Sequence, residues 1–313
     1  MSSGGRRFRL AAFTKNRTNP AYIGARLGAD RVAARLGSSL THYVPLVPDD
    51  VEEQRALLEA ALVSCPDAIL LAPTHVTALN DILSRVVAEG IPLVCFIGRP
   101  AGIPCTSFVS SDDRALARGI AGYLFDSLDP EGGDVVTIEG HPNAMTTAPR
   151  AAGFREAAEA RSNIRIAGSR VGDYQRDRGR AAMAELIAAV PRIDGVLAAN
   201  DFMALGALEA MREAGRRLPI VGINATPEGI AAIKAGELLA SSSFDAMKIA
   251  CLAVEAAVRA LRGERVPSEI LLPVEVVDRS NCGAWDKPYA ERPLPEWEAC
   301  VPSLPTLVGR GSG

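Results

Sequence analysis

Polar and aromatic side chains follow the predicted strands of this 313-residue chain at the points where the strands end. One apolar run stops at Asn200-Asp201 and passes at once into a segment with helical spacing. Ligand pockets in open α/β folds lie beyond the carboxyl ends of strands, so we expect such residues to line a cleft. The candidates are Lys15, Asn19, Tyr22, Arg99, Arg150, Tyr174, Asn200, Asn224 and Phe244.

The chemistry of these side chains suits the binding of a hydroxylated small molecule. Aromatic rings cover the apolar C–H faces of a sugar, and planar arginine and asparagine groups offer donors and acceptors to adjacent hydroxyls. Each residue also has a structural explanation, because arginines form surface ion pairs, tyrosines fill cores and asparagines cap helices. Their recurrence at successive strand ends favours a binding cleft.

Strand and helix patterns alternate along the chain, which predicts βαβ units and mainly parallel sheets. The first series has strands at 8–13, 41–47, 67–72, 92–97 and 106–110, and helices at 20–36, 50–63, 75–89 and 112–127. The second has strands at 134–139, 164–169, 194–199, 218–223 and 238–243, and helices at 146–160, 175–190, 201–214 and 225–235. A helix at 246–262 and an apolar strand pattern at 270–277 follow.

The two series repeat one another. Residues 67–72 match 194–199 at an offset of 127, and the same offset places 91–94 on 218–221. Because one ungapped offset aligns a strand, a helix and the next strand, we expect two similar α/β lobes.

Two helix starts carry predicted caps. Asn19 precedes Pro20, which is favoured in the first turn of a helix because its missing N–H has no partner there. Asp201 is expected to cap the helix at 201–214, which leaves the Asn200 amide free to face the cleft.

Composition narrows the class of protein. The net charge of −3 and the few aromatic residues argue against a surface for nucleic acid. No run approaches about 18 apolar residues, so no membrane insertion is expected. The six cysteines show no CxxC spacing, so we expect neither a metal nor another cofactor. Cys282 and Cys300 either pair or stay free, since spacing alone does not supply the geometry of a bridge.

Motifs of the common enzyme classes are missing from the sequence. No GxGxxG follows the first strand, and neither a GxSxG elbow nor a P-loop occurs. His75 and His141 lie just past strand ends, with no Ser or Cys placed as a nucleophile. We therefore expect no catalytic residues and no enzymatic activity.

The residues that follow the strand at 194–199 carry a family resemblance. Asn200-Asp201, followed by residues 203–208 (Met-Ala-Leu-Gly-Ala-Leu), resembles the signature of type I periplasmic sugar-binding proteins of the ribose-binding group and of the related LacI effector domains. Asn19-Pro20-Ala21-Tyr22 and 150–154 (Arg-Ala-Ala-Gly-Phe) are similar to two sugar-binding motifs of that group, and Tyr174 lies at its stacking aromatic. The likeness covers most of residues 8–277.

The resemblance implies two Rossmann-like lobes with parallel-type sheets, joined by a three-stranded hinge. The chain would cross between lobes near Ser110-Ser111, Ser243-Phe244 and Pro273. The lobes would comprise 6–111 with 245–273 and 112–244 with 274–284. Residues 285–313 are expected to form a Pro-rich strap that packs on the surface through its indole rings.

The resemblance also implies function. It predicts a monomeric solute-binding protein, periplasmic after removal of a signal peptide, that closes on a sugar, polyol or sugar acid and serves an ABC transporter permease. Gly98 and Asn224 stand where the family has aspartates, and Phe244 where it has glutamine. The loss of acidic residues suggests either a ligand with a carboxylate or phosphate, or a shorter polyol. The alternative is a LacI-type effector domain, against which we count the seven residues before Phe8.

Overall fold

The computed structural model describes residues 7–128 and 130–301. Residue 6, at the predicted start of the first lobe, and residues 302–313 of the predicted strap lie outside the described residues. Among the described residues, no helix is long and apolar enough to cross a membrane.

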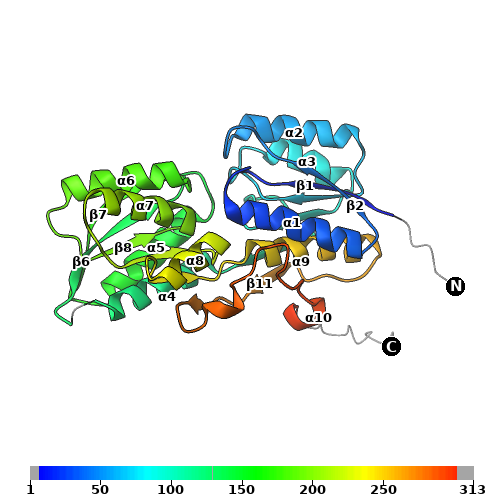
Figure 1. Ribbon diagram of the computed structural model, residues 1–313. Coiled ribbons are helices and arrows are strands. Elements are labelled where there is room, and N and C mark those ends of the chain that lie inside the picture. The colour runs from blue at the N-terminus through cyan, green and yellow to red at the C-terminus, as the bar shows by residue number, and fades with distance from the viewer. Residues whose placement is uncertain (1–6, 129, 302–313) are drawn as a thin grey trace, which may run out of the picture.

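Two six-stranded sheets form separate lobes that lie side by side (Figure 1). The first sheet has the order β11-β5-β4-β3-β1-β2, and its strands are β1 (Arg9–Phe13), β2 (Ser39–Tyr43), β3 (Ala68–Leu71), β4 (Leu93–Phe96), β5 (Ser107–Ser111) and β11 (Glu269–Leu272). The second has the order β12-β10-β9-β8-β6-β7, and its strands are β6 (Gly133–Glu139), β7 (Ile164–Val171), β8 (Gly195–Ala198), β9 (Ile220–Ile223), β10 (Ala240–Ser242) and β12 (Val276–Val277). All pairs are parallel except β10 with β12.

Helices cover both sheets (Figure 1). The first lobe has α1 (Pro20–Arg35), α2 (Val51–Val63), α3 (Asn80–Ala88) and α9 (Ala246–Leu261). The second has α4 (Asp113–Asp126), α5 (Thr147–Glu159), α6 (Arg176–Ala189), α7 (Asp201–Glu213) and α8 (Pro227–Ala235). Two short helices, η1 (Cys282–Ala284) and α10 (Trp297–Cys300), follow.

The internal repeat predicted from the sequence is confirmed by the sheets. β3 and β8 occupy equivalent positions in the two strand orders, and so do β4 and β9, the pairs that the sequence offset aligns. In each lobe the second strand lies at one edge of the sheet, and the third strand lies on the other side of the first strand. In folds of this order the carboxyl ends of the strands form the ligand side.

The chain passes between lobes at three points, close to the predicted positions. It leaves the first sheet after Ser111 and returns between Ser242 and Ala246. The third passage divides the apolar pattern at 270–277 near Pro273, where the resemblance placed it: β11 pairs with β5 and β12 with β10, in different sheets. Pro273 lies between them, where a residue without an N–H loses no ladder bond.

The bounds of two elements also differ from expectation. The helix expected at 75–89 begins only at Asn80, because His75 Nδ1 accepts the N–H groups of Thr77 and Ala78 and holds a turn before it. The strand expected at 41–47 ends at Tyr43, two residues before Pro45, which cannot donate to a ladder.

The helix α9 is apolar around most of its surface and is buried against α1 and the first sheet. Small residues of α1 permit this close approach. A Cβ at Gly28 would lie 2.7 Å from Met247 Cγ and 2.8 Å from Cys251 Sγ, so a larger residue would push the helices apart.

The described part of the strap, residues 285–301, contacts both lobes (Figure 1). Arg31 of α1 donates to the carbonyl oxygens of Tyr289 and Arg292, at 3.2 and 2.8 Å. Arg292 Nη2 in turn donates to the carbonyl oxygen of Ala225 in the second lobe, at 3.1 Å. Trp297 is buried, with the Arg259 guanidinium 4.8 Å from its ring centre. The strap therefore ties α1 to the β9–α8 turn.

Replacing Arg292 with alanine tests this tie. Arg292 is buried and also donates to the carbonyl oxygens of Trp285 and Lys287, so its loss removes three hydrogen bonds. We expect Arg292→Ala to lower the free energy of unfolding by about 2–3 kcal/mol in urea denaturation. Arg212→Ala, which removes an exposed ion pair with Glu237, should change it by less than about 0.5 kcal/mol. Equal changes in the free energy of unfolding of the two variants would show that the Arg292 hydrogen bonds do not stabilise the contact of the strap with the second lobe.

Candidate functional site

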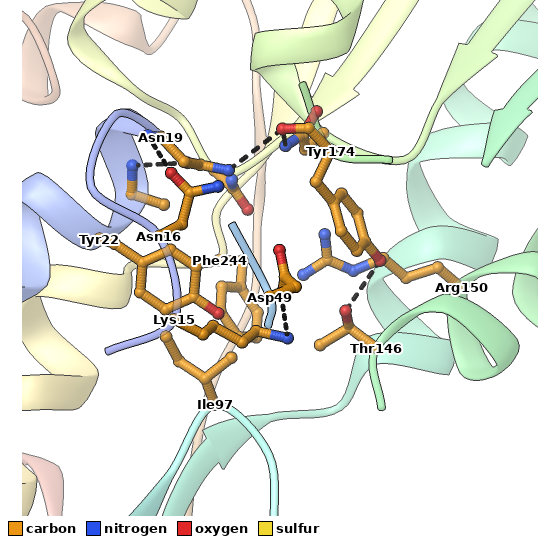
Figure 2. A pocket seen from close by; sticks show the side chains of 13 residues that line it. Lys15, Asn16, Asn19, Tyr22, Asp49, Ile97, Thr146, Arg150, Tyr174 and Phe244 are labelled. Carbon is orange, nitrogen blue, oxygen red and sulfur yellow. Dashed lines mark hydrogen bonds and ion pairs between the residues drawn. The ribbon is translucent and has the colours of Figure 1, made fainter. Parts of the chain in front are cut away.

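A cavity of about 410 Å³, counting the part open to solvent, lies between the two lobes at the carboxyl ends of their strands (Figure 2). The lining residues come from both lobes and from the hinge; they are Lys15, Asn16, Asn19, Ala21, Tyr22, Asp49, Ile97, Thr146, Arg150, Tyr174, Asn200, Asn224 and Phe244.

Eight of the nine predicted site residues line this cavity, and Arg99 does not. Its side chain is 55 % exposed, 3.4 Å from Glu269 Oε1, with the guanidinium 5.0 Å from the centre of the Phe108 ring. The backbone explains the difference: Ile97 has a φ of +67° and faces the cavity in place of Arg99. Gly98 lies against Met145 of the second lobe, where a Cβ would meet its sulfur at 2.7 Å.

Five lining residues were not among the predicted ones: Asn16, Ala21, Asp49, Ile97 and Thr146. Asp49 matters most because it carries charge. It precedes α2 in the doublet Asp49-Asp50, and such a doublet reads as a helix cap. In the structure Asp50 caps α2 by accepting the Glu53 N–H, and Asp49, at a φ of +60°, turns into the cavity.

Lys15 and Asp49 form a buried ion pair on the first-lobe side, with 3.1 Å between Nζ and Oδ1. Burial lowers the pKa of Lys15, but the Tyr22 hydroxyl and the Asp49 carboxylate raise it by more, so the net pKa is raised and the ammonium stays charged. Burial also raises the pKa of Tyr22 to about 12. The Tyr22 hydroxyl therefore remains both a donor and an acceptor at neutral pH.

Arg150 forms the matching ion pair on the second-lobe side. Its Nε donates to Asp113 Oδ1 and its Nη1 to the carbonyl oxygen of Ala199, both at 2.7 Å. Burial raises the pKa of Asp113, and Arg150 opposes that shift. The guanidinium lies 4.9 Å from the ring centre of Phe244 and 5.7 Å from that of Tyr174. One side-chain acceptor and one backbone acceptor thus fix one edge of the guanidinium. Figure 2 shows that its tip is directed toward Asp49 and Lys15.

Two asparagine amides meet at one carbonyl oxygen. Asn19 Nδ2 of the first lobe and Asn200 Nδ2 of the second both donate to the Tyr174 carbonyl oxygen, at 3.4 Å. Figure 2 shows the bond from Asn19. Asn19 Oδ1 also caps α1, as predicted. The two lobes are therefore in direct contact at this edge of the cavity.

The prediction that Asp201 caps α7 and leaves the Asn200 amide free is wrong. Asn200 itself caps α7, with Oδ1 accepting the Met203 N–H at 2.8 Å, and only its Nδ2 faces the cavity side. Asp201 is the first residue of α7, and its carboxylate points instead at the next loop. It accepts from the Thr226 N–H at 2.8 Å and from Ser241 Oγ at 2.6 Å. An Asn cap satisfies the helix end equally well, which frees the Asp for this contact.

Asp201 positions the turn that carries Asn224. Gly222 and Gly229 surround it, and a Cβ at Gly222 would lie 2.3 Å from its Oδ1. Burial raises the pKa of Asp201 from its usual 3.8 to about 6, although the hydrogen bonds from Ser241 and Thr226 oppose the shift. Asn224 follows directly after β9 with a φ of +123°, which directs it to the cavity.

Tyr174 shapes the wall rather than lying free in the cavity. Asp173 and Tyr174 both adopt left-handed backbone, with φ of +51° and +58°, and this turn brings the ring onto Gly140. A Cβ at Gly140 would lie 2.0 Å from Tyr174 Cζ, so only glycine fits there. The hydroxyl contacts Thr146 Oγ1 at 2.8 Å and accepts from Thr147 Oγ1 at 3.1 Å.

No group of three or more His, Cys, Asp or Glu side chains within residues 7–128 and 130–301 is arranged to hold a metal ion. The cavity can bind a ligand through hydrogen bonds. Its walls present amides, hydroxyls, two cations and one carboxylate beside the rings of Phe244 and Tyr22.

Comparisons with known proteins agree with this geometry. The model of the family described as "Periplasmic binding protein domain" matches residues 10–265. The chain is 27% identical over 275 residues to the ribose import binding protein of Bacillus subtilis, covering 88% of each chain. It is 30% identical over 243 residues to the D-ribose/D-allose-binding protein of Pseudomonas aeruginosa, covering 73% of this chain and 75% of that one.

A solved ABC transporter solute-binding protein from Mycobacterium smegmatis, with bound glycerol, superimposes with a TM-score of 0.83 at 27% identity. The match covers 89% of this chain and 96% of that chain. The two-lobed α/β fold is thus that of type I periplasmic binding proteins.

The raised pKa of Asp201 should make the stability of the wild type depend on pH in a way that the Asp201→Asn variant lacks. Because its pKa is higher in the folded than in the unfolded chain, the folded protein binds more protons between about pH 4 and 6, and the stability from this group falls as pH rises through that window. We expect the unfolding free energy of the wild type relative to Asp201→Asn to decrease by up to about 3 kcal/mol from pH 4 to pH 7. Denaturant titrations at both pH values measure this difference, and a difference that is constant or grows with pH contradicts the assignment.

Proposed function

The chain belongs to the periplasmic binding protein family, and we propose that it serves an ABC transporter by binding a neutral sugar or polyol between its lobes. The proposal that the ligand is uncharged rests on one observation. Both cations of the cavity already have a carboxylate partner: Lys15 pairs with Asp49, and Arg150 pairs with Asp113. The relatives bind ribose or allose by name, and a solved neighbour holds glycerol, all of them uncharged.

The charge balance argues against the sugar acid or phosphate that the sequence suggested. A buried ion pair has its charge already compensated, so an additional carboxylate would enter the cavity without a free cation to neutralise it. A hydroxyl both donates and accepts, so it can use an ammonium or guanidinium N–H and a carboxylate oxygen at the same time. Lys15, Asp49 and Arg150 together offer both kinds of partner to one ring of hydroxyls.

The apolar part of the cavity supports the same ligand class. Phe244 and Ile97 are buried and lie on the walls, and the Tyr22 ring faces the same space (Figure 2). These surfaces cover the C–H face of a pyranose or furanose, whereas the polar groups reach its hydroxyl edge. A purely apolar ligand would offer no hydrogen-bond partner to the Asn224 amide, which lines the cavity.

Hinge closure follows from where the groups originate. A ligand that contacts Lys15 from one lobe and Arg150 from the other has those contacts together only when the lobes close, so it stabilises the closed state by its differential affinity. The bond from Asn19 to the Tyr174 carbonyl adds to the same state. We propose that a permease recognises the closed form and that the protein acts in the periplasm; the description of its family as periplasmic binding proteins supports this.

Asn200→Asp tests the donor that faces the cavity without removing the helix cap. The carboxylate keeps the Oδ1 acceptor for the Met203 N–H but loses the Nδ2 donor. We expect the affinity for a neutral sugar or polyol to fall at least about tenfold, which is about 1.4 kcal/mol. The melting temperature is measured beside it, because the variant also loses the hydrogen bond to the Tyr174 carbonyl oxygen. Asn163→Asp, at an exposed turn, is the matched control and should bind as the wild type does. Unchanged affinity in Asn200→Asp would remove this residue from the site.

Asp49→Asn tests the charge of the ligand. It leaves the Lys15 ammonium uncompensated, so the affinity for a sugar acid relative to its neutral parent sugar should rise at least about tenfold over the wild-type ratio. Calorimetric titration with sugar acids, pentoses, hexoses and polyols measures the ratio. Asp50→Asn, the neighbouring cap of α2, should leave it unchanged. Wild-type protein that binds a sugar acid more tightly than every neutral sugar and polyol contradicts the proposal.

A further inference from the structure

Two cysteines lie in contact in the first lobe, away from the cavity. Cys95 is in β4, and Cys105 is in the segment that connects β4 to β5. Their sulfur atoms are 2.9 Å apart, closer than ordinary contact between two sulfur atoms, so no other atom separates them. The distance to a disulfide bond of about 2.05 Å is covered by a small movement of the connecting segment.

The surroundings of the two thiols differ in a way that suits stepwise oxidation. Cys95 is fully buried beneath the connecting segment, whereas Cys105 is partly exposed and reaches the surface. The contact between them, together with burial, raises the pKa of Cys95, and the same contact lowers the pKa of Cys105. Arg99 favours the thiolate form of both. The accessible thiol is thus the better nucleophile.

No other pair of cysteines has this arrangement among the described residues. Cys65 is exposed, Cys251 is buried within α9, and each of them has no second sulfur in contact. Cys282 and Cys300, which the sequence left as a possible pair, are both free thiols in the structure, and the only hydrogen bond found for Cys282 Sγ goes to the Arg279 carbonyl oxygen.

We propose that Cys95 and Cys105 are a redox pair that closes to a disulfide by exchange with a low-molecular-weight disulfide or an oxidised thiol protein. The Cys105 thiolate attacks one sulfur of the oxidant, forms a mixed disulfide and expels one thiolate. Cys95 then loses its proton to solvent and attacks Cys105 Sγ, which expels the second thiolate. Two cysteine thiols are oxidised, one disulfide is reduced to two thiols, and the protons balance.

The bridge would fix the segment that carries Ile97 and Arg99. Residues 95–105 become a closed ring, which restricts the unfolded chain and holds the left-handed turn at Ile97 beside the cavity. This inference is independent of the identity of the ligand, because it rests on the contact between two sulfur atoms and not on the cavity.

Thiol counting in glutathione redox buffers tests the proposal on the full chain. Reduced protein that is denatured and alkylated should show six free thiols, and protein equilibrated with oxidised glutathione should show four. Peptide mass mapping without reductant should join Cys95 to Cys105, and the melting temperature should rise by a few degrees in the oxidised form. Cys105→Ser should keep five thiols in both buffers, and Cys251→Ala, a buried cysteine without a partner, should still lose two.

Three results would overturn the pair. Six thiols that persist at every glutathione ratio would show that no bridge forms. A bridge between two other cysteines in the peptide map of Cys105→Ser would assign the redox pair elsewhere, and a stable glutathione adduct on Cys105 would show that Cys95 does not resolve the mixed disulfide.

Discussion

The pairing of each buried cation in the cleft with a carboxylate is the constraint on which the site depends. An ammonium or guanidinium removed from water needs a compensating charge, and removing one partner of such a pair leaves the other uncompensated at a cost of several kcal/mol. Lys15 has Asp49 and Arg150 has Asp113, one pair from each lobe. The pairs hold donors and acceptors in fixed directions before any ligand arrives, and they set the charge that a ligand can bring.

Each acidic partner belongs to a pair of consecutive aspartates, which explains why neither was predicted from the sequence as a partner of a cation. In Asp49-Asp50 the second residue caps α2, and in Asp112-Asp113 the first caps α4 by accepting from the Arg114 and Ala115 N–H groups. The remaining member of each doublet turns to a cation. A doublet before a helix predicts a cap, but it does not tell which carboxylate is the cap, because that depends on backbone angles such as the φ of +60° at Asp49.

The alternation of strands and helices and the ungapped repeat predicted the two sheets, since these depend on local periodicity and on burial. Eight of the nine predicted site residues reach the cavity because the carboxyl ends of parallel strands converge, whatever the details of the loops. Arg99 and the roles of Asn200 and Asp201 were misjudged because they depend on single turns: the left-handed Ile97, and an Asn cap that frees the Asp for Thr226. The crossing near Pro273 was predicted by the family resemblance and not by the apolar pattern at 270–277, which is continuous across the two strands. Contacts made across the chain, such as that of Arg292 with Ala225, leave no local pattern.

The identity of the molecule released by the purified protein tests the account most directly. Protein purified without added sugar, then denatured and analysed by mass spectrometry of the small-molecule fraction, should release a neutral polyhydroxylated compound in an amount close to one per chain. The Asn200→Asp variant should release much less of it. A stoichiometric ligand that is anionic or apolar would contradict the central claim that the paired charges of the cleft select an uncharged, hydroxyl-rich molecule.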